Sequence, residues 1–333
     1  MQDIPVVIVG GGLSGLYAAL LLEQKGIAYR LLEARNTLGG RIAVAKCSDA
    51  HATNNSTDID QAESSAAFDL GPSWFWPDYQ TQLSTLIESL DLSRFAQFEA
   101  GDMMVERIAN QPPVRMQGYK SAPPSMRLVG GMAALIDALY ARLDASCIMT
   151  SQTVQQLNRT PQHIEVQSED TSGHVNGHVT TFRAQHVLLA LPPRLVEGRI
   201  AFQPALPQDL SEQWRETATW MAPHAKYVAV YESPFWRDAG LSGAARSAIG
   251  PLTEIHDAST LESDGALFGF FGVPAQVRQS VSDTVLKEHC RAQLVRLFGE
   301  QASTPKAEYL RDWATDPLTA MPADASGNGG KTV

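Results

Sequence analysis

VVIVGGGLSGLYAALLLEQKGIAYRLLEARNTLGGR, residues 6–41, is the stretch of sequence that decides the fold. It opens with four apolar, β-branched residues, which are typical of a strand buried in a parallel sheet. A glycine loop follows, and it allows a tight turn and a close approach of the backbone to a pyrophosphate. The next residues, 16–25, are rich in alanine and leucine and stop at Gly26, which predicts a helix with a glycine at its C-terminal end. The loop consists of Gly10, Gly11, Gly12, Leu13, Ser14 and Gly15.

A second strand is expected over residues 27–32, and Glu33 follows at its end. A carboxylate at this place can accept hydrogen bonds from a ribose 2′-hydroxyl, and it would repel a 2′-phosphate. The order of strand, glycine loop, helix, strand and acid therefore predicts a dinucleotide-binding βαβ unit. The fold expected around this unit is α/β, with a Rossmann-like parallel sheet between helices and a smaller mixed domain beside it.

A second glycine pair, Gly39 and Gly40, stands just before Arg41. The glycines let the backbone pass close to a bound anion, and the arginine can make a forked contact with phosphate. This pair favours a flavin dinucleotide over a nicotinamide one. The alternative is an ordinary turn that carries a solvated arginine.

Length and composition limit the class of protein. With 333 residues, 44% hydrophobic and 19% charged, the chain can bury a substantial core and form about two domains. A net charge of −10 argues against nucleic acid or an anionic membrane as a partner, and it is compatible with attraction of cationic amines. The three cysteines are widely spaced, so neither a disulfide framework nor a metal site is expected. Because strand residues begin at position 5 or 6 and no apolar run reaches ~18–20 residues, the predicted location is the cytoplasm.

The rest of the chain alternates between polar loops and short periodic elements. Residues 46–66 are polar and predict a flexible excursion, and His174 and His178 flank glycines and are not expected to hold a metal. Apolar spacing predicts helices around residues 83–90, after Gly130-Gly131 and over 282–298. Strands are expected within 101–127 and 147–190, with a buried strand over His186–Leu191, and again at 225–231 and around 266–272.

Five stretches of the sequence together resemble the flavin-containing amine oxidases. The resemblance implies FAD as cofactor, an amine as substrate and molecular oxygen as acceptor. The amine would be oxidised to an imine by hydride transfer to flavin N5, with release of peroxide. The stretches are residues 6–42, FDLGPSWFW (68–76), RLVGGM (127–132), HVLLALPP (186–193) and AKYVAVYESPFWR (225–237).

The resemblance also implies a division into domains. The FAD-binding domain would be discontinuous and comprise residues 1–76 and 127–200. The substrate domain would comprise residues 77–126 and 201–320, and residues 321–333 would form a disordered tail.

Cofactor contacts carry over from the family residue by residue. Pro72 departs from the family, which usually has a second glycine there, and this change removes one backbone N–H donor. Trp74 and Trp313 are matched to the substrate pocket, although the aromatic run 74–76 could equally be plain core. The matched cofactor positions are Gly10, Gly12, Leu13, Ser14, Gly15, Glu33, Ala34, Arg35, Gly39, Gly40, Arg41, Gly71, Pro72, Ser73, Trp74 and Val154.

Lys226 is the candidate catalytic residue. On the predicted strand 225–231 it shares a face with Val228 and Val230, so its ammonium needs a polar partner or a route to the surface. One reading is a lysine at the start of a strand that reaches into solvent. The resemblance implies another, because this position matches the lysine that family members place near flavin N5 through a water.

A further departure from the family leaves rival interpretations open. The family's last flavin-binding segment, a glycine-rich strand and a helix, is not found in these residues, so the chain is expected to bind FAD weakly and to oxidise amines poorly by itself. One alternative function is a renalase-like or other flavin oxidase that acts on a different carbon centre. A second alternative is a truncated, non-catalytic chain that only binds flavin.

Overall fold

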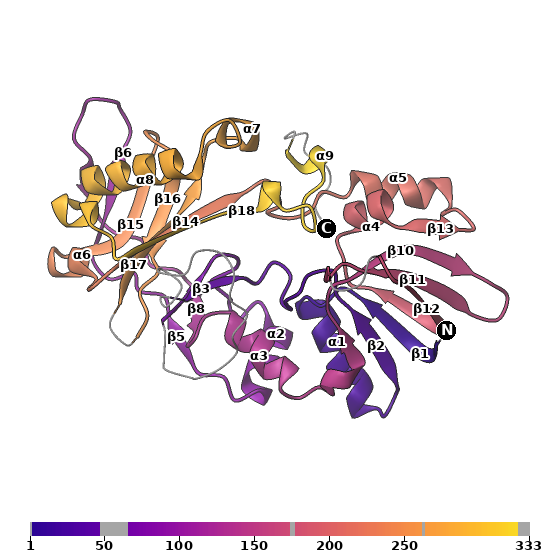
Figure 1. The fold of residues 1–333 in the computed structure, drawn as a ribbon. Coiled ribbons are helices and arrows are strands. Elements are labelled where there is room, and N and C mark those ends of the chain that lie inside the picture. Colours follow the sequence, from indigo (N-terminus) through magenta and orange to yellow (C-terminus); the bar gives the residue numbers. More distant parts are fainter. Residues whose placement is uncertain (1, 47–65, 174–176, 262–263, 326–333) are drawn as a thin grey trace. The chain divides into compact units, whose positions relative to one another are not determined.

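The computed structural model describes residues 2–46, 66–173, 177–261 and 264–325 of this protein (Figure 1). Most of the polar excursion at 46–66, and His174, lie outside the described residues. The chain forms two compact units that are interleaved in sequence. The first unit comprises Met1–Ile42, Leu135–Ala222 and Trp313–Val333, and the second comprises Ala43–Ala134 and Pro223–Asp312.

These units differ from the expected domains at several boundaries. By their contacts, residues 43–76 and 127–134 belong to the second unit, and residues 201–222 and 313–320 belong to the first. The two units are regions of dense internal contact, whereas the expected domains group the residues by whether they would bind the cofactor or the substrate. The functional division therefore stays a prediction.

The first unit is built on a seven-stranded mixed sheet in the order β13-β10-β11-β12-β1-β2-β9. At its centre β1 runs parallel to both β2 and β12, while β11 pairs antiparallel with β10 and β12. This is the α/β, Rossmann-like architecture that the sequence predicts. The strands are β1 Gln2–Val9, β2 Tyr29–Leu32, β9 Ile148–Met149, β10 Gln152–Arg159, β11 Ile164–Asp170, β12 Val179–Leu189 and β13 Ala201–Gln203.

The helix α1, Leu13–Gln24, connects β1 to β2. It buries Leu16, Ala19 and Leu20. It ends where Gly26 takes φ +64°, the left-handed conformation that glycine adopts without strain. The sheet buries its own apolar cluster, which includes Val7, Val9, Leu32, Val166 and Phe182. The other helices of this unit are α4 Pro193–Arg199, α5 Gln208–Glu216 and α9 Pro322–Ala325, with single 3₁₀ turns at Ala145–Cys147 and Trp313–Thr315.

The strand expected over His186–Leu191 is present as the end of β12, but it is not buried. Leu188 is 42% exposed, and His186 is exposed as well. Side chains alternate between the faces of a strand. Val187 and Leu189 pack against the core cluster, whereas the face that bears His186 and Leu188 is open in the described part of the chain. The apolar run was therefore a correct signal for a strand and a wrong one for burial on both faces.

The tail expected to be disordered from residue 321 is ordered at its start. Pro322–Ala325 form α9, and the buried Asp324 accepts hydrogen bonds from the Thr219 N–H (3.0 Å), the Met321 N–H (2.9 Å) and the Arg194 guanidinium. This buried carboxylate has three hydrogen-bond donors, and these bonds hold the turn in place. The small residues around it gave no such signal.

The second unit contains a seven-stranded sheet in the order β18-β14-β17-β16-β15-β6-β7. Most neighbouring strands are antiparallel, and β15 runs parallel to β6. Figure 1 shows α8 lying along this sheet. The strands are β6 Asp102–Glu106, β7 Val114–Met116, β14 Ala225–Tyr231, β15 Leu241–Ser247, β16 Leu252–Asp257, β17 Gly265–Phe271 and β18 Ala307–Asp312.

The two faces of β14 belong to different cores. Tyr227, Ala229 and Tyr231 pack in the cluster that includes Leu294 and Leu297 of α8. Val228 and Val230 pack on the other face with Phe68 and Phe268. Lys226 shares that second face because it is two residues from Val228. The alternation predicted for 225–231 therefore holds, with every residue of the strand buried.

Smaller elements complete the second unit. Asp283–Phe298 form α8, whose cap Ser282 accepts a hydrogen bond from the Val285 N–H (3.4 Å). No helix in the described parts of the chain has the length and apolar character needed to cross a membrane. The remaining elements are the pairs β3 Val44–Lys46 with β4 Ala67–Asp69 and β5 Arg94–Ala96 with β8 Met126–Leu128, the helices α2 Thr81–Ser89, α6 Phe235–Asp238 and α7 Ala275–Arg278, the 3₁₀ turn Glu300–Ser303, and α3 Ala133–Tyr140, which runs across the boundary of the two units.

Candidate functional site

The glycine loop between β1 and α1 leaves no room for side chains at two positions. A Cβ on Gly15 would lie 1.9 Å from the carbonyl oxygen of Gly10, far inside van der Waals contact. Gly10 itself has φ +107°, and its Cβ would meet the carbonyl oxygen of Ala190 at 2.7 Å. Glycine is thus required here by the packing of backbone on backbone. The spacing that the sequence shows is the spacing that this turn needs.

The loop delivers the N-terminus of α1 to an open position. Gly12 is the N-cap, with no side chain to bond the first amides of the helix, and the first turn carries no acidic residue. A Cβ at Gly12 would meet only Gly39 and Gly40 backbone atoms, at 3.9 and 4.0 Å. Unsatisfied N–H groups and the positive end of the helix dipole favour an anion at this place. A pyrophosphate fits this cradle by chemistry and by space.

Glu33 stands at the end of β2 as the sequence predicts, and it is 4% exposed. Its Oε2 accepts the Gly11 N–H at 2.6 Å and its Oε1 accepts the Arg35 N–H at 2.8 Å. These two bonds fix the carboxylate beside the glycine loop. Each carboxylate oxygen can accept a further bond, so the group can also receive ribose hydroxyls.

The second glycine pair joins the first. The Gly39 N–H donates to the Gly11 carbonyl oxygen (2.9 Å), and a parallel bridge connects Gly12 to Gly39. Gly39 and Gly40 have φ +108° and +59°, which their lack of a Cβ allows. Arg41 is exposed and donates to the Trp220 carbonyl oxygen at 2.9 Å.

Arg35 lies in a polar network that the sequence did not reveal. Its guanidinium Nη2 donates to Asp316 Oδ1 at 2.8 Å and to Thr319 Oγ1 at 3.1 Å. Both partners stand about 280 residues further along the chain. No local motif could have indicated them.

The remaining predicted positions of the first unit differ in exposure. Ser14 is exposed, whereas Leu13 and Ala34 are half-buried. Val154 is buried in the core cluster of the sheet, next to a β-bulge in β10. Trp313 is 5% exposed. The first unit thus holds all the predicted positions from the N-terminal 41 residues together with Val154 and Trp313.

The second unit holds the other predicted positions, Gly71 to Trp74 and Lys226. Lys226 is 2% exposed. Its Nζ donates to Ser73 Oγ at 2.6 Å and to the Gly71 carbonyl oxygen at 3.2 Å. The same atom lies 4.0 Å from the centre of the Phe268 ring, which is a cation–π contact. Its ammonium therefore ends inside the protein and not in solvent, contrary to the reading of a strand-end lysine that reaches water.

Burial governs the electrostatics around Lys226. Burial lowers the pKa of Lys226, the charge of Asp69 opposes this shift and the charge of Arg127 adds to it, and the resulting pKa is about 7. Burial also raises the pKa of the Asp69 carboxyl, whereas its hydrogen bond from the Met132 N–H (2.8 Å) acts in the opposite direction. Arg127 donates to the carbonyl oxygens of Ala258 (3.0 Å) and Ser259 (2.8 Å). Asp69 was missed by sequence reasoning, and its only signal was its place at the start of the segment DLGPS.

The Phe268 ring beside the lysine belongs to a group of aromatic rings. The Trp74 ring lies 5.2 Å from the Phe268 ring and 4.8 Å from the His256 ring, centre to centre. The Trp74 indole N–H donates to Gln97 Oε1 at 2.7 Å. Phe75, its neighbour, is fully buried and belongs to the core, and Pro72 is exposed. Trp74 is half-buried, which is compatible with lining a site.

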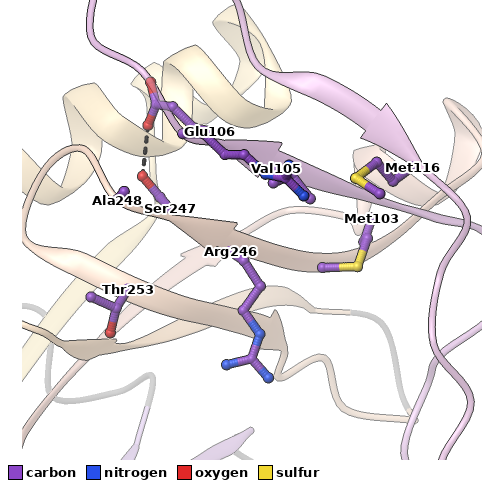
Figure 2. Close-up of a pocket in the computed structure, with 9 residues that line it drawn as sticks. Met103, Val105, Glu106, Met116, Arg246, Ser247, Ala248 and Thr253 are labelled. Atoms are coloured by element: carbon purple, nitrogen blue, oxygen red, sulfur yellow. Dashed lines mark hydrogen bonds between the residues drawn. The ribbon is translucent and has the colours of Figure 1, made fainter.

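An open cavity of about 420 Å³ lies elsewhere in the second unit, against β6, β7 and β15 (Figure 2). Its wall includes Met103, Val105, Met116 and Arg246, and none of the predicted site residues. The described residues contain no cluster of three or more His, Cys, Asp or Glu side chains able to hold a metal ion.

Two family models match this chain. Residues 8–90 match a NAD(P)-binding Rossmann-like domain, which is the class of fold that the glycine loop and β1-α1-β2 define. Residues 97–329 match the model described as flavin containing amine oxidoreductase. The chain therefore belongs to the flavin-containing amine oxidoreductase family, and FAD is the cofactor that this family implies.

Individual relatives agree with this assignment. The chain is 30% identical to putrescine oxidase of Kocuria rosea over 58% of its own length and 41% of the relative. It is 25% identical to a probable flavin-containing monoamine oxidase A of Dictyostelium discoideum over 56% of its length and 39% of the relative. The matches thus span about two fifths of these curated relatives.

Solved structures share the fold. A putrescine oxidase bound to putrescine superposes with a TM-score of 0.77 at 20% identity, covering 96% of this chain and 86% of that one. Cyclohexylamine oxidase from Brevibacterium oxydans gives a TM-score of 0.77 at 18% identity, with the same coverage.

Proposed function

We propose that this chain is an FAD-dependent oxidase that converts an amine to an imine, with oxygen as the final acceptor and peroxide as a product. The observation that carries the proposal is the buried ammonium of Lys226, held on the segment 71–74 among aromatic rings. Membership in the amine oxidoreductase family supports the same reaction class. Bound FAD supplies the hydride acceptor for this chemistry.

The first unit offers the groups that would hold the cofactor. The N-terminal amides of α1, at Leu13 to Gly15, would bind the pyrophosphate, because the glycine loop leaves them open. The carboxylate of Glu33 would receive the adenosine ribose. Arg35, Arg41 and Val154 remain proposed contacts.

The second unit offers the groups that would serve the reaction. The Lys226 amine has a pKa of about 7, so near neutral pH it can hold or release a proton at Nζ. Phe268 and Phe270 place apolar ring surface beside it, and its burial excludes water, which strengthens its electrostatic effect on a neighbouring group. Trp74 is the proposed pocket residue of this unit, and Trp313, which lies in the first unit, stays a pocket residue only by resemblance to the family.

The substrate class is a proposal as well. The relatives are named for putrescine and for monoamines, and the net charge of −10 is compatible with a cationic substrate. A renalase-like or other flavin oxidase would use the same cofactor site with a different substrate.

The test is peroxide release from purified chain supplied with FAD and a panel of amines: putrescine, cyclohexylamine and benzylamine. We expect release with at least one of them, and a loss of at least about tenfold in Lys226→Met, which corresponds to ~1.4 kcal/mol of barrier. Peroxide from a non-amine substrate alone would favour the other flavin oxidases. Bound FAD without turnover of any substrate would favour a non-catalytic flavin-binding chain.

A further inference from the structure

The segment 69–73, which accepts the hydrogen bonds of the Lys226 ammonium, is held by hydrogen bonds at both of its ends. At its start, Asp69 Oδ1 accepts the Met132 N–H at 2.8 Å, and the Leu70 N–H donates to the Ala43 carbonyl oxygen at 2.8 Å. At its end, Ser73 is 7% exposed, and its Oγ accepts a hydrogen bond from Lys226 Nζ at 2.6 Å. The segment 69–73 thus carries a buried carboxylate, Asp69, at one end and the hydrogen-bond acceptor of Lys226, Ser73, at the other.

The glycine beside Asp69 shows how closely this carboxylate is fitted. A Cβ on Gly131 would lie 2.8 Å from Asp69 Oδ1, so a side chain there would displace the carboxylate. Gly131 has φ +73°, which presents the following N–H of Met132 to Asp69. Glycine at position 131 therefore leaves room for the Asp69 carboxylate, which explains physically why the sequence has glycine there.

We propose that Asp69 and Ser73 are positioning residues that direct the Lys226 ammonium and govern whether it carries its proton, an inference that rests on the role proposed for Lys226. Ser73 Oγ and the Gly71 carbonyl oxygen accept two of its N–H bonds and so fix its direction. Asp69 supplies the negative charge that offsets Arg127. Neither residue needs to touch a substrate to act in this way.

The charges around Lys226 determine the sign of each effect. Asp69 on β4 raises the pKa of Lys226, and Arg127 on β8 lowers it. Arg311 is the cross-strand partner on β18, and the hydrogen-bonded pair Glu254 and His256 lies on β16 beside Phe268. Removing the Asp69 charge takes away the charge that raises the pKa of Lys226, while burial and Arg127 continue to lower it. Removing the Ser73 hydroxyl takes away a hydrogen bond that is stronger with the charged form than with the neutral one.

The experiment measures the proton on Lys226 directly. The full chain is labelled at lysine ¹³Cε, and the NMR signal of Lys226 is identified by its absence in Lys226→Met and followed against pH. In the native protein we expect a midpoint near 7. In Asp69→Asn and in Ser73→Ala we expect midpoints lower by about one pH unit.

Two further variants keep the test decisive. Ser73→Thr retains the hydroxyl and should restore the native midpoint, and Ser242→Ala removes an equally buried hydroxyl that donates to the Asp102 carbonyl oxygen and should change nothing. Unchanged midpoints in both Asp69→Asn and Ser73→Ala would overturn the proposal. An equal shift in Ser73→Thr would also overturn it, because the hydroxyl would then be irrelevant.

A parallel measurement separates this inference from the proposed function. Amine-driven bleaching of bound FAD is recorded anaerobically against pH for the same variants. If the Lys226 midpoint shifts and the pH profile of bleaching shifts with it, both ideas stand. If the lysine midpoint shifts while bleaching is unchanged, Asp69 and Ser73 still position Lys226, and the catalytic role of Lys226 fails.

Discussion

The glycine loop of the first unit and the lysine site of the second are built in opposite ways. At the loop, the Gly11 N–H meets the carboxylate of Glu33, 22 residues further along the chain, and both lie within one βαβ unit. At the lysine, Nζ meets a hydroxyl 153 residues away, and the neighbouring carboxylate of Asp69 lies at the end of β4, in the same distant segment. A site built from backbone groups that are close in sequence can be predicted from the spacing of its residues. A site built from buried side chains depends on how distant segments pack.

The largest effect is expected when one methyl group is added to the glycine loop. Gly15→Ala places a Cβ 1.9 Å from the Gly10 carbonyl oxygen, so the turn must open. We expect FAD affinity to fall about a hundredfold, or ~2.7 kcal/mol. Fluorescence titration with FAD measures it. Gly26→Ala is the control: nothing lies within 4 Å of its Cβ, and although its φ of +64° makes the alanine cost some stability, the residue lies outside the loop and the change should leave affinity unchanged. Native affinity in Gly15→Ala would show that the loop does not hold the cofactor.

The corresponding change in the second unit is Lys226→Met. It keeps the bulk of the side chain and removes the charge and both N–H donors. We expect amine-driven flavin reduction or reoxidation to slow by at least about tenfold, ~1.4 kcal/mol, with FAD still bound. Stopped-flow absorbance measures both steps. Lys287→Met, on α8, serves as the control. Unchanged rates would make Lys226 a structural residue only.

A milder change in the loop site is Glu33→Gln. It retains the side-chain size but weakens charge-assisted bonds to ribose hydroxyls, each worth about 1.5–3 kcal/mol. We expect roughly tenfold weaker FAD binding and an intact fold, checked by titration and circular dichroism. Glu212→Gln, a change on the exposed face of α5, should have no effect. Equal affinities in the two variants would remove Glu33 from the site.

The smallest effect concerns pH and the lysine site. The folded protein holds the pKa of Lys226 near 7, below its value in the unfolded chain, so between these values the unfolded state binds the extra proton. Stability due to this residue therefore rises with pH in that window. We expect the unfolding free energy of the native protein to rise by about 1 kcal/mol relative to that of Lys226→Met between pH 7.5 and 8.5. Urea unfolding at the two pH values would contradict this if the difference stayed constant.

The comparison also explains how much could be predicted from sequence. The strand, loop and helix of the first 41 residues, and the position of Glu33, followed from periodicity and glycine spacing because all these contacts are local. The strand that carries Lys226 followed from alternation in the same way.

Other features needed the tertiary structure. The partners of Arg35 are about 280 residues away, and Asp69 acts on Lys226 through a fold that brings β4 and β14 together. The exposure of Leu188 depends on what covers a sheet, and the order of α9 depends on the ion pair of Asp324 with Arg194. None of these has a local sequence signal.

Titration of the purified chain with FAD, followed by flavin fluorescence, tests the central claim most directly, because every proposed step needs the cofactor in the glycine loop. We predict saturable binding of one FAD per chain, weakened in Glu33→Gln and lost in Gly15→Ala over the same concentration range. Absence of saturable binding, or equal binding by the native chain and Gly15→Ala, would contradict the account.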